Sequence, residues 1–226
     1  LEYHLLGNHL FANAKALVFA GIFFEGLEAD KWLDKGLSIL RNQIPEQFLD
    51  DGAHFEISTT YHALLTEDLF DIIQTMQMAD QDIPKEWMVT AHKALEWFHL
   101  ITRPDGLPPL FNDAAYGITP SFGAMSLYGK KIRLNSPPPL LKGMHDMPAS
   151  GYFRYEGDSY SFFGDAGQIG PSYLPGHAHC DMLSFELFAH GNPLIVDTGI
   201  STYEVCDRRH HERSTAAHNT VQIDDK

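Results

Sequence analysis

Histidine and aspartate side chains gather in one short stretch of this sequence, residues 176–197. Apolar and more polar residues alternate over 183–187, which is typical of a half-buried strand. Extending this alternation backwards places His177, His179 and Asp181 on one face of that strand. Imidazole nitrogens and carboxylate oxygens are ligands that zinc accepts, so the stretch predicts a metal site; the alternative is a set of surface histidines beside a strand.

A further carboxylate, Asp197, and a further histidine, His218, follow later, each next to a β-prone run. A simple hairpin between the two runs would place Asp197 opposite roughly residue 186, about 20 Å along the strand from His179. The two side chains can therefore bind one ion only if residues 177–181 curl back over the sheet. The periodicity does not show such a curl.

Two polar groups interrupt the more helical first half of the chain. Asn8 and His9 lie on an otherwise apolar helix face, where polar groups must be hydrogen-bonded or face a cleft. The second group, residues 51–62, includes Tyr61 near an expected helix start, where the helix dipole stabilises anions, so Tyr61 is a candidate to lose its proton. The structural alternatives are an asparagine bonded to a neighbouring helix and a tyrosine packed at a helix contact.

These residue types suit one reaction class if a cleft between the two halves brings them together with Tyr203, Arg209 and Arg213. An amide and a histidine can hold a carboxylate and stabilise an enolate-like state. A tyrosine or histidine can take the proton alpha to that carboxylate, and a tyrosine can return one to the leaving oxygen. No paired-carboxylate glycosidase site is indicated, although Asp51, Glu56 and Asp113 leave that alternative open.

The order of the patterns predicts helices first and a sheet afterwards, an α+β chain of two domains. Apolar residues at helical spacing predict helices over Leu1–Glu25, Glu28–Leu49 with a kink or restart at Pro45, Glu56–Met76 and Pro84–Phe98. Residues 111–128 are expected to form a loop and a short helix. Aromatic, glycine-punctuated runs predict antiparallel strands over Gly151–Tyr155, Tyr160–Gly164, Leu183–Ala189, Leu194–Val196 and Thr220–Ile223. The expected boundaries are 1–130 for the helical domain, 131–148 for a linker and 149–226 for the sheet domain.

Composition narrows the classes of partner. The formal net charge of −14 and the lack of a basic stripe argue against nucleic acid, and an anionic polymer would need a locally positive cleft. No apolar run is long enough to predict a membrane span. Cys180 and Cys206 could pair or remain free thiols. The chain lacks an initiator methionine and stops just after a strand begins, so we expect a fragment of a longer protein, and a signal peptide stays open.

Several motifs together resemble the heparinase II/III and alginate lyase group of polysaccharide lyases. They are spread in that family's order over nearly the whole chain: Gly7-Asn8-His9 with Asn13, residues 51–58 with Tyr61-His62, Gly176-His177-x-His179-x-Asp181, Val196-Asp197-Thr198-Gly199, and residues 213–220. The resemblance implies a partial (α/α) toroid of antiparallel helices followed by an antiparallel β-sandwich, with the site between them. It also implies that earlier toroid helices and most of the sandwich are missing from this piece.

By the same resemblance, Asn8 and His9 neutralise a uronate carboxylate, while Tyr61 and His177 are the catalytic tyrosine and histidine. Tyr203 falls near a second tyrosine of the family. The residues expected to bind substrate are His54, Glu56 and Arg213. The implied zinc ligands are His179, Asp197 and His218, around a mainly structural ion; the residues considered alone leave Asp181 as a further possible ligand.

The resemblance implies cleavage of a uronic-acid polysaccharide by β-elimination, which leaves a 4,5-unsaturated sugar. One alternative is a non-catalytic glycan-binding or exopolysaccharide-biosynthesis accessory protein, which would lose little on Tyr61→Phe. Another is a zinc hydrolase with His177, His179 and Asp181 as ligands of an open site. Access to such a polymer predicts a periplasmic or secreted location. The sequence leaves the polymer and the oligomeric state open, with a homodimer among the alternatives.

Overall fold

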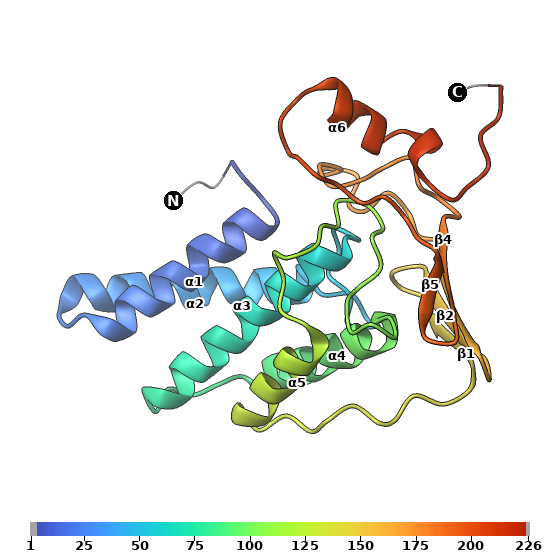
Figure 1. Cartoon of the computed structure of the whole chain (residues 1–226). Helices are drawn as coiled ribbons and strands as arrows, with labels where there is room; N and C mark the ends of the chain where they lie inside the picture. Colours follow the sequence, from blue (N-terminus) through green and yellow to red (C-terminus); the bar gives the residue numbers. More distant parts are fainter. Residues whose placement is uncertain (1–3, 225–226) are drawn as a thin grey trace.

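The computed structural model describes residues 4–224, in which a helical half precedes a sheet half (Figure 1). The helices are α1 Asn8–Phe23, α2 Leu27–Gln47, α3 Thr59–Met78, α4 Lys85–Ile101 and α5 Phe122–Lys131, with a short α6 Asp207–Glu212 near the end. The α+β prediction is therefore confirmed. No helix within residues 4–224 is both long and apolar enough to cross a lipid bilayer.

Helix α1 differs from its prediction at its start, and helix α2 differs from its prediction at Pro45. Residues 1–3 lie outside the described part, and α1 begins at Asn8 because Gly7, with φ of 60°, breaks the helical path. Helix α2 continues through Pro45 to Gln47, so the predicted restart is wrong. Pro45 lies in the last turn of α2, where a lost backbone donor disrupts little of the helix that follows it.

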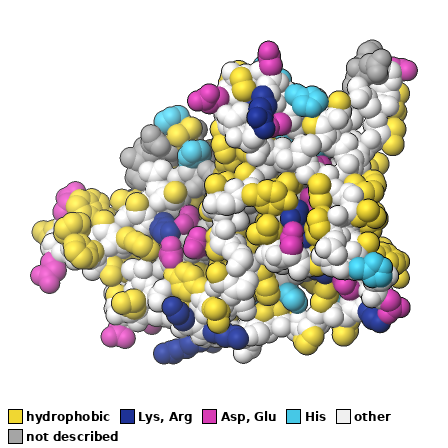
Figure 2. Space-filling view, in the orientation of Figure 1, with side chains coloured by type: hydrophobic (Ala, Val, Ile, Leu, Met, Phe, Trp, Pro, Cys, Tyr) yellow, Lys and Arg dark blue, Asp and Glu magenta, His cyan; other side chains and the backbone are white. Residues whose placement is uncertain are grey.

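Helices α1 and α2 form a long hairpin, and α3 and α4 pack beside it (Figure 1). Their shared core consists of aliphatic and aromatic side chains, among which Phe11, Leu40 and Phe70 are fully buried. The tip of the α1–α2 hairpin is different: Phe23 and Leu27 are exposed there and form part of an apolar end of the molecule (Figure 2).

The sheet half is an antiparallel meander whose five strands follow chain order. The strands are β1 Gly143–Met147, β2 Tyr152–Glu156, β3 Tyr160–Asp165, β4 Phe185–Ala189 and β5 Asn192–Ile195. Strand β1 lies inside the segment expected to be a linker. Residues 220–223 are not a strand; instead, the Asn219 amide donates to the carbonyls of Phe185 and Val196 near the ends of β4 and β5.

The sheet packs directly against the helical half. Tyr152 of β2 contacts the rings of Trp97 and Phe111, with ring centroids 5.6 Å away in both cases. A buried ion pair joins Arg103, just after α4, to Glu186 of β4 at 3.1 Å. These contacts fix the two halves as one unit, so a cleft between them has walls of defined geometry.

One buried histidine in α3 makes stability depend on pH. His62 is fully buried against Trp97, accepts a hydrogen bond from His54 N–H at Nδ1 (3.2 Å), and lies 3.1 Å from Ala94 O through Nε2. This pattern needs a neutral ring, and burial lowers the pKa of His62 from 6.5 to about 3. As the pH falls, His62 therefore binds a proton in the unfolded chain at a higher pH than in the folded chain.

We expect the free energy of unfolding to be fully retained above pH 6.5 and to decrease as the pH falls from 6.5 towards 3, following the lowered pKa of His62. Each unit of pKa difference corresponds to about 1.4 kcal/mol. Urea unfolding at a series of pH values measures the slope. The His62→Gln variant, which cannot titrate, should show a shallower slope; His92→Gln, on the outer side of α4, is the control. Equal slopes in wild type and His62→Gln would contradict the prediction.

Candidate active site and metal centre

A cleft of about 410 Å³ opens between the start of α1 and the segments around residues 174–177 and 203–213. Its carboxylates are Glu56 and Asp113. Its basic side chains are those of His4, His9, His177, Arg209, His210 and Arg213. Cationic and imidazole groups thus outnumber carboxylates here, although the chain as a whole is strongly acidic. The formal positive charges of this lining are Arg209 and Arg213, and Arg209 is paired with Asp113.

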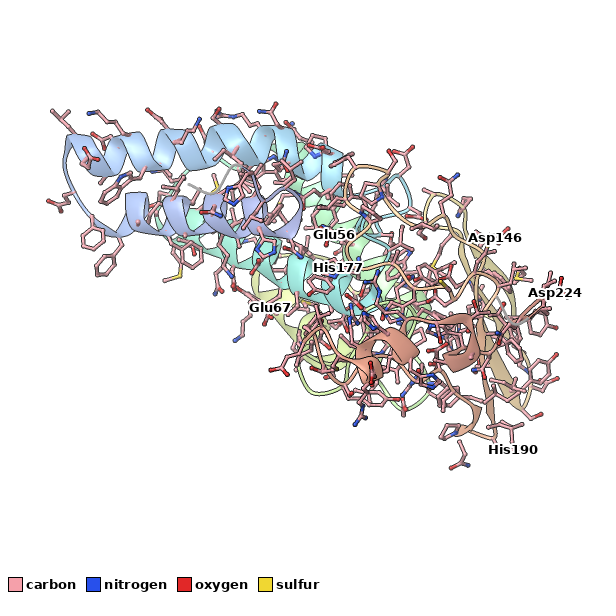
Figure 3. The ribbon with its side chains drawn as sticks, turned by 90° about the horizontal axis from the view of Figure 1, so that it is seen from above. Glu56, Glu67, Asp146, His177, His190 and Asp224 are labelled. Atoms are coloured by element: carbon pink, nitrogen blue, oxygen red, sulfur yellow. The ribbon has the colours of Figure 1, made fainter. Side chains whose placement is uncertain are left out.

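His177 lines this cleft and lies close to Glu56 (Figure 3). Its Nδ1 is 2.9 Å from Asp113 Oδ2, and its Nε2 is 3.2 Å from Asn8 Nδ2 and 3.5 Å from Glu56 Oε2. An ionised carboxylate only accepts and an amide nitrogen only donates, so Nδ1 carries the proton of the neutral ring. Nε2 is then the unprotonated nitrogen, and it accepts from the Asn8 amide.

Asn8 and Glu56 are paired with each other as well as with His177. Asn8 donates to Glu56 through its backbone N–H (3.3 Å) and its Nδ2 (3.2 Å). Gly7 makes this approach possible, because a Cβ at that position would overlap Glu56 Oε1 and the Leu174 side chain. Burial raises the pKa of Glu56, although His177 and the Asn8 hydrogen bonds oppose the rise.

Asp113 is a buried carboxylate held by several partners. Burial alone would raise its pKa, but hydrogen bonds with His177, His179 and Arg209 hold that pKa below its usual range. The side chain is 1% exposed, so these partners, rather than water, stabilise the negative charge.

Tyr61 stacks on His177 with ring centroids 3.7 Å apart and an interplanar angle of 29°. Its hydroxyl donates to the Tyr203 hydroxyl at 3.3 Å. Burial, then the Tyr203 hydrogen bond, then the charges of Asp113 and Glu56 raise the pKa of Tyr61 well above 10.0. The expectation that the helix dipole favours loss of the Tyr61 proton is therefore wrong, because desolvation and neighbouring negative charges outweigh the dipole.

The three residues expected to bind substrate have different positions. Glu56 and Arg213 line the cleft, and Arg213 also donates to Ala178 O through Nε (3.1 Å) and Nη2 (2.7 Å). His54 does not reach the cleft: it is 1% exposed, lies behind Glu56, and has its Nε2 3.0 Å from Gln47 Oε1. An isolated β-bridge with Phe48 turns His54 into the core, so that prediction is wrong.

The segment before β4 is not a strand. Leu183 has φ of 65° and is exposed, so the backward extension of the strand pattern to His177, His179 and Asp181 is wrong. The segment bends instead, and the ligand atoms of His179, Asp181 and His218 lie within 4.8 Å of one another. Asp197, whose approach to His179 was the reason to expect a curl, is not a member of this group.

The donor atoms of this cluster fit a metal ion. His179 Nδ1 and His218 Nε2 are buried and have no hydrogen-bond partner. The other ring nitrogens have carboxylate partners: His179 Nε2 is 2.6 Å from Asp113 Oδ1, and His218 Nδ1 is 2.9 and 3.0 Å from the two oxygens of Asp197. Two imidazoles with nearby carboxylates form a donor set typical of zinc, and carboxylates behind ligand histidines orient the rings. Asp197 thus lies beside His218, while Asp181 completes the three-residue cluster.

Two family descriptions match this chain: "Heparinase II/III N-terminus" over residues 1–122 and "Heparinase II/III-like, C-terminal" over residues 139–226. The chain belongs to the heparinase II/III family. A heparin-sulfate lyase of Bacteroides stercoris is 30% identical over 99% of this chain, which spans 36% of that relative's length.

Solved heparinase III structures share the fold of this family member. One is 25% identical and covers 100% of this chain and 38% of its own, with a TM-score of 0.77. Another is 22% identical and covers 98% of this chain and 40% of its own, with a TM-score of 0.83. The helical half is accordingly part of the toroid, and the sheet is part of the β-sandwich.

Sequence reasoning missed Asn112 and gave Asp113 no part in the heparinase-type site. Both are buried in the loop after α4, where Asn112 donates its backbone N–H to Asp181 Oδ2 at 2.6 Å. The available signal was a polar Asn-Asp pair directly after the apolar Leu110-Phe111. Cys180, which could have paired with Cys206, is an exposed free thiol, as is Cys206.

Proposed function

We propose that the protein containing this chain is a polysaccharide lyase that cleaves a uronic-acid-containing polysaccharide by β-elimination. The observation that supports this most is the convergence of Asn8, Tyr61 and His177: Asn8 and His177 line one cleft, and Tyr61 stacks on His177. Similarity to curated heparin-sulfate lyases favours a heparan-sulfate-type polymer as the first substrate to test. Because the substrate is an external polymer, we also propose a periplasmic or secreted location.

The proposed reaction uses the cleft residues in separate roles. Asn8 and His9 hold the uronate carboxylate and stabilise the negative charge that develops on it. His177 Nε2 removes the C5 proton, while Asp113 keeps the other ring nitrogen protonated. The C5–H electron pair forms the C4–C5 double bond as the C4–O bond breaks. Tyr61, which retains its proton in the free site, donates it to the leaving oxygen, and Tyr203 orients the Tyr61 hydroxyl.

The charged cleft residues have a part in binding. Arg213 and Arg209 offer positive charge to the polymer, while Glu56 orients Asn8 through two hydrogen bonds. Glu56 therefore supports Asn8, the group proposed to hold the substrate carboxylate.

We propose a structural zinc ion bound by His179, His218 and Asp181, with the carboxylate of Asp197 holding the His218 ring from behind. When bound, such an ion ties the loop before β4 to the segment after α6. The side chains of His179 and His218 are fully buried, which suits a closed structural site rather than an open hydrolytic one. This burial argues against the zinc-hydrolase alternative.

His179→Ala and His218→Ala are each expected to remove most of the bound zinc and to lower the melting temperature. Each loses a nitrogen donor from a buried set, and structural zinc contributes directly to folding free energy. Asp181→Asn and Asp197→Asn should each weaken zinc binding by about 10–100-fold. Elemental analysis and thermal unfolding measure the two effects, with the exposed His211→Ala as control. Full zinc content in His179→Ala would contradict the assignment.

The function itself is tested by incubating the full-length protein with a panel of uronate polymers: heparan sulfate, alginate and bacterial exopolysaccharides. An increase in the ultraviolet absorbance of unsaturated uronates supports a lyase and identifies the polymer. A flat trace on every polymer, with zinc bound and the protein folded, would favour the glycan-binding alternative. New reducing ends without that absorbance would indicate hydrolysis.

A further inference from the structure

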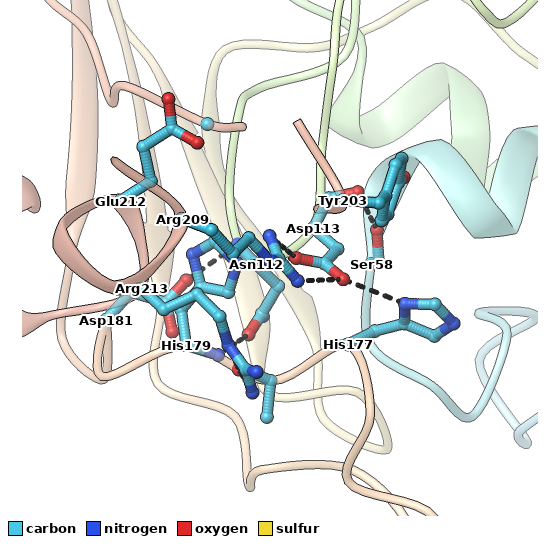
Figure 4. A network of polar contacts seen from close by, with 12 residues as sticks. Ser58, Asn112, Asp113, His177, His179, Asp181, Tyr203, Arg209, Glu212 and Arg213 are labelled. Atoms are coloured by element: carbon cyan, nitrogen blue, oxygen red, sulfur yellow. Dashed lines mark hydrogen bonds and ion pairs between the residues drawn. The ribbon is translucent and has the colours of Figure 1, made fainter. Parts of the chain in front are cut away.

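One carboxylate joins the two functional centres of the molecule. Asp113 Oδ2 lies 2.9 Å from His177 Nδ1 in the cleft, and Asp113 Oδ1 lies 2.6 Å from His179 Nε2 in the metal-binding cluster (Figure 4). Arg209 closes the other side, with Nη1 2.6 Å from Oδ1 and Nη2 2.8 Å from Oδ2. Asp113 thus contacts a candidate catalytic ring and a candidate zinc-ligand ring at once.

We propose that Asp113 is a positioning residue that sets the orientation and proton position of His177 and of His179 together, and so links the metal centre to catalysis. The inference rests on the proposed lyase function for its catalytic half. In both rings one nitrogen faces Asp113 and the other faces away from it. His177 Nε2 points to Asn8, and His179 Nδ1 is the unpartnered donor of the metal cluster. A carboxylate behind a histidine fixes both its tautomer and its rotation.

The backbone around Asp113 is held by the same loop that carries the histidines. Asn112 has φ of 55°, a left-handed conformation that asparagine tolerates better than most residues. In this conformation it donates N–H to Asp181 Oδ2 (2.6 Å) and accepts from His179 N–H through Oδ1 (3.0 Å). Asp113 N–H in turn donates to His177 O at 3.2 Å. The carboxylate therefore moves only if the metal-binding loop moves.

A second connection reaches the tyrosine side of the cleft. Ser58, which directly precedes α3, donates its hydroxyl to Asp113 O at 3.1 Å. Tyr61 lies in the first turn of α3 and stacks on His177. Asp113 is consequently anchored between the helix that presents Tyr61 and the loop that presents His177. A change at the metal centre would reach both groups through one residue.

Asp113→Asn in the full-length protein tests the link, because asparagine keeps the shape of the side chain but presents an amide to one of its partners. At saturating zinc we expect kcat to fall about 100-fold with KM changed less than about threefold, since ring orientation rather than binding is lost. The zinc dissociation constant, measured by competition with a chelator, should rise about 10–100-fold. Both effects should appear in the same variant.

Asp51→Asn is the matched control. Asp51 also joins the helical half to the sheet half, accepting from the backbone N–H and the hydroxyl of Ser150 at 2.8 Å, but it contacts neither histidine. We expect wild-type kcat and zinc affinity in this variant. Equal losses in Asp51→Asn and Asp113→Asn would overturn the proposal, because they would report a general weakening of the joint between the halves.

Two further outcomes would overturn the link. If Asp113→Asn has wild-type kcat at saturating zinc, Asp113 acts only on the metal centre. If its zinc affinity is unchanged, Asp113 acts only on His177. If Asp113→Asn does not fold, Asp113→Glu serves instead: it keeps the charge opposite Arg209 but displaces the carboxylate, so both kcat and zinc affinity should still fall. Wild-type values there would contradict the positioning role.

The proposed function can fail independently of this inference. If the wild-type protein cleaves no polymer, the lyase proposal fails. The zinc titrations of Asp113→Asn and Asp51→Asn still decide whether Asp113 supports the metal centre. A crystal structure of Asp113→Asn would then show whether the His177 ring keeps its position against Asn8. An unmoved ring would contradict the proposed effect of Asp113 on His177.

Discussion

Replacement of His177 by alanine is expected to lower kcat on a uronate polymer by about 1,000-fold, the range of a lost general base. Nε2 of this ring faces the cleft residue Asn8, 3.2 Å from the amide that would hold the substrate. Asp113 cannot replace it, because its oxygens are engaged with His179 and Arg209. Initial rates from the absorbance of the unsaturated product measure the effect.

His210→Ala is the matched control for this prediction. His210 lines the same cleft on α6, but no described contact joins it to Asn8 or Tyr61. We expect its removal to change KM more than kcat, as for a group that contributes uniform binding. A His177→Ala variant that keeps kcat within about tenfold of wild type would show that another group removes the proton.

Local patterns predicted most of the fold because the helices and central strands follow their periodicities. The failures have local physical causes. Leu5 and Leu6 continue the apolar pattern of α1, but the left-handed conformation of Gly7 separates them from the helix. Strand β1, Gly143–Met147, lacks the β-branched and aromatic residues that mark strands, and its position in the sheet depends on pairing with β2.

The candidate site was predicted in part, because motif spacing identifies residue types but not their distances. Asn8 and Tyr61 both contact His177, and the catalytic roles implied for them by the resemblance stay a prediction. The bend that brings His179 near His218 depends on the positive φ of Leu183 and on contacts with Asn112, which no periodic pattern encodes. The part of Asp113 in this site was missed for the same reason, since it arises only from partners about 65 to 95 residues away in the chain.

His54 illustrates the opposite error. It was expected to bind substrate because it belongs to a motif, but its side chain is buried and cannot reach the cleft. It stands two residues before Glu56, which lines the cleft, yet its ring faces Gln47 in the core. Burial lowers the pKa of His54 well below its ordinary value, so the ring stays neutral. Its place in the motif is explained by its support of the segment that presents Glu56.

Tyr61→Phe is expected to lower kcat by about 100–10,000-fold, because it removes the proton donor to the leaving oxygen and leaves the stacked ring in place. The raised pKa of Tyr61 predicts the pH dependence of the wild-type enzyme. A donor must be protonated, so wild-type kcat should show no alkaline decrease attributable to Tyr61 up to pH 10.0, the ordinary tyrosine value, and should decrease only beyond it. The measurement is kcat at a series of alkaline pH values, with activity rechecked after return to neutral pH.

The opposite role for Tyr61 gives an opposite profile. If the phenolate were the base, only a small ionised fraction would be active near neutral pH, and kcat would rise about tenfold for each pH unit towards the raised pKa. Tyr203→Phe separates orientation from proton donation: it keeps the Tyr61 proton but removes its hydrogen-bond acceptor, so we expect a smaller loss in kcat with the same alkaline behaviour. If kcat rises with pH in both the wild type and Tyr203→Phe, the assignments of Tyr61 and His177 are reversed. Tyr61 would then have to lose its proton to act, as a base does.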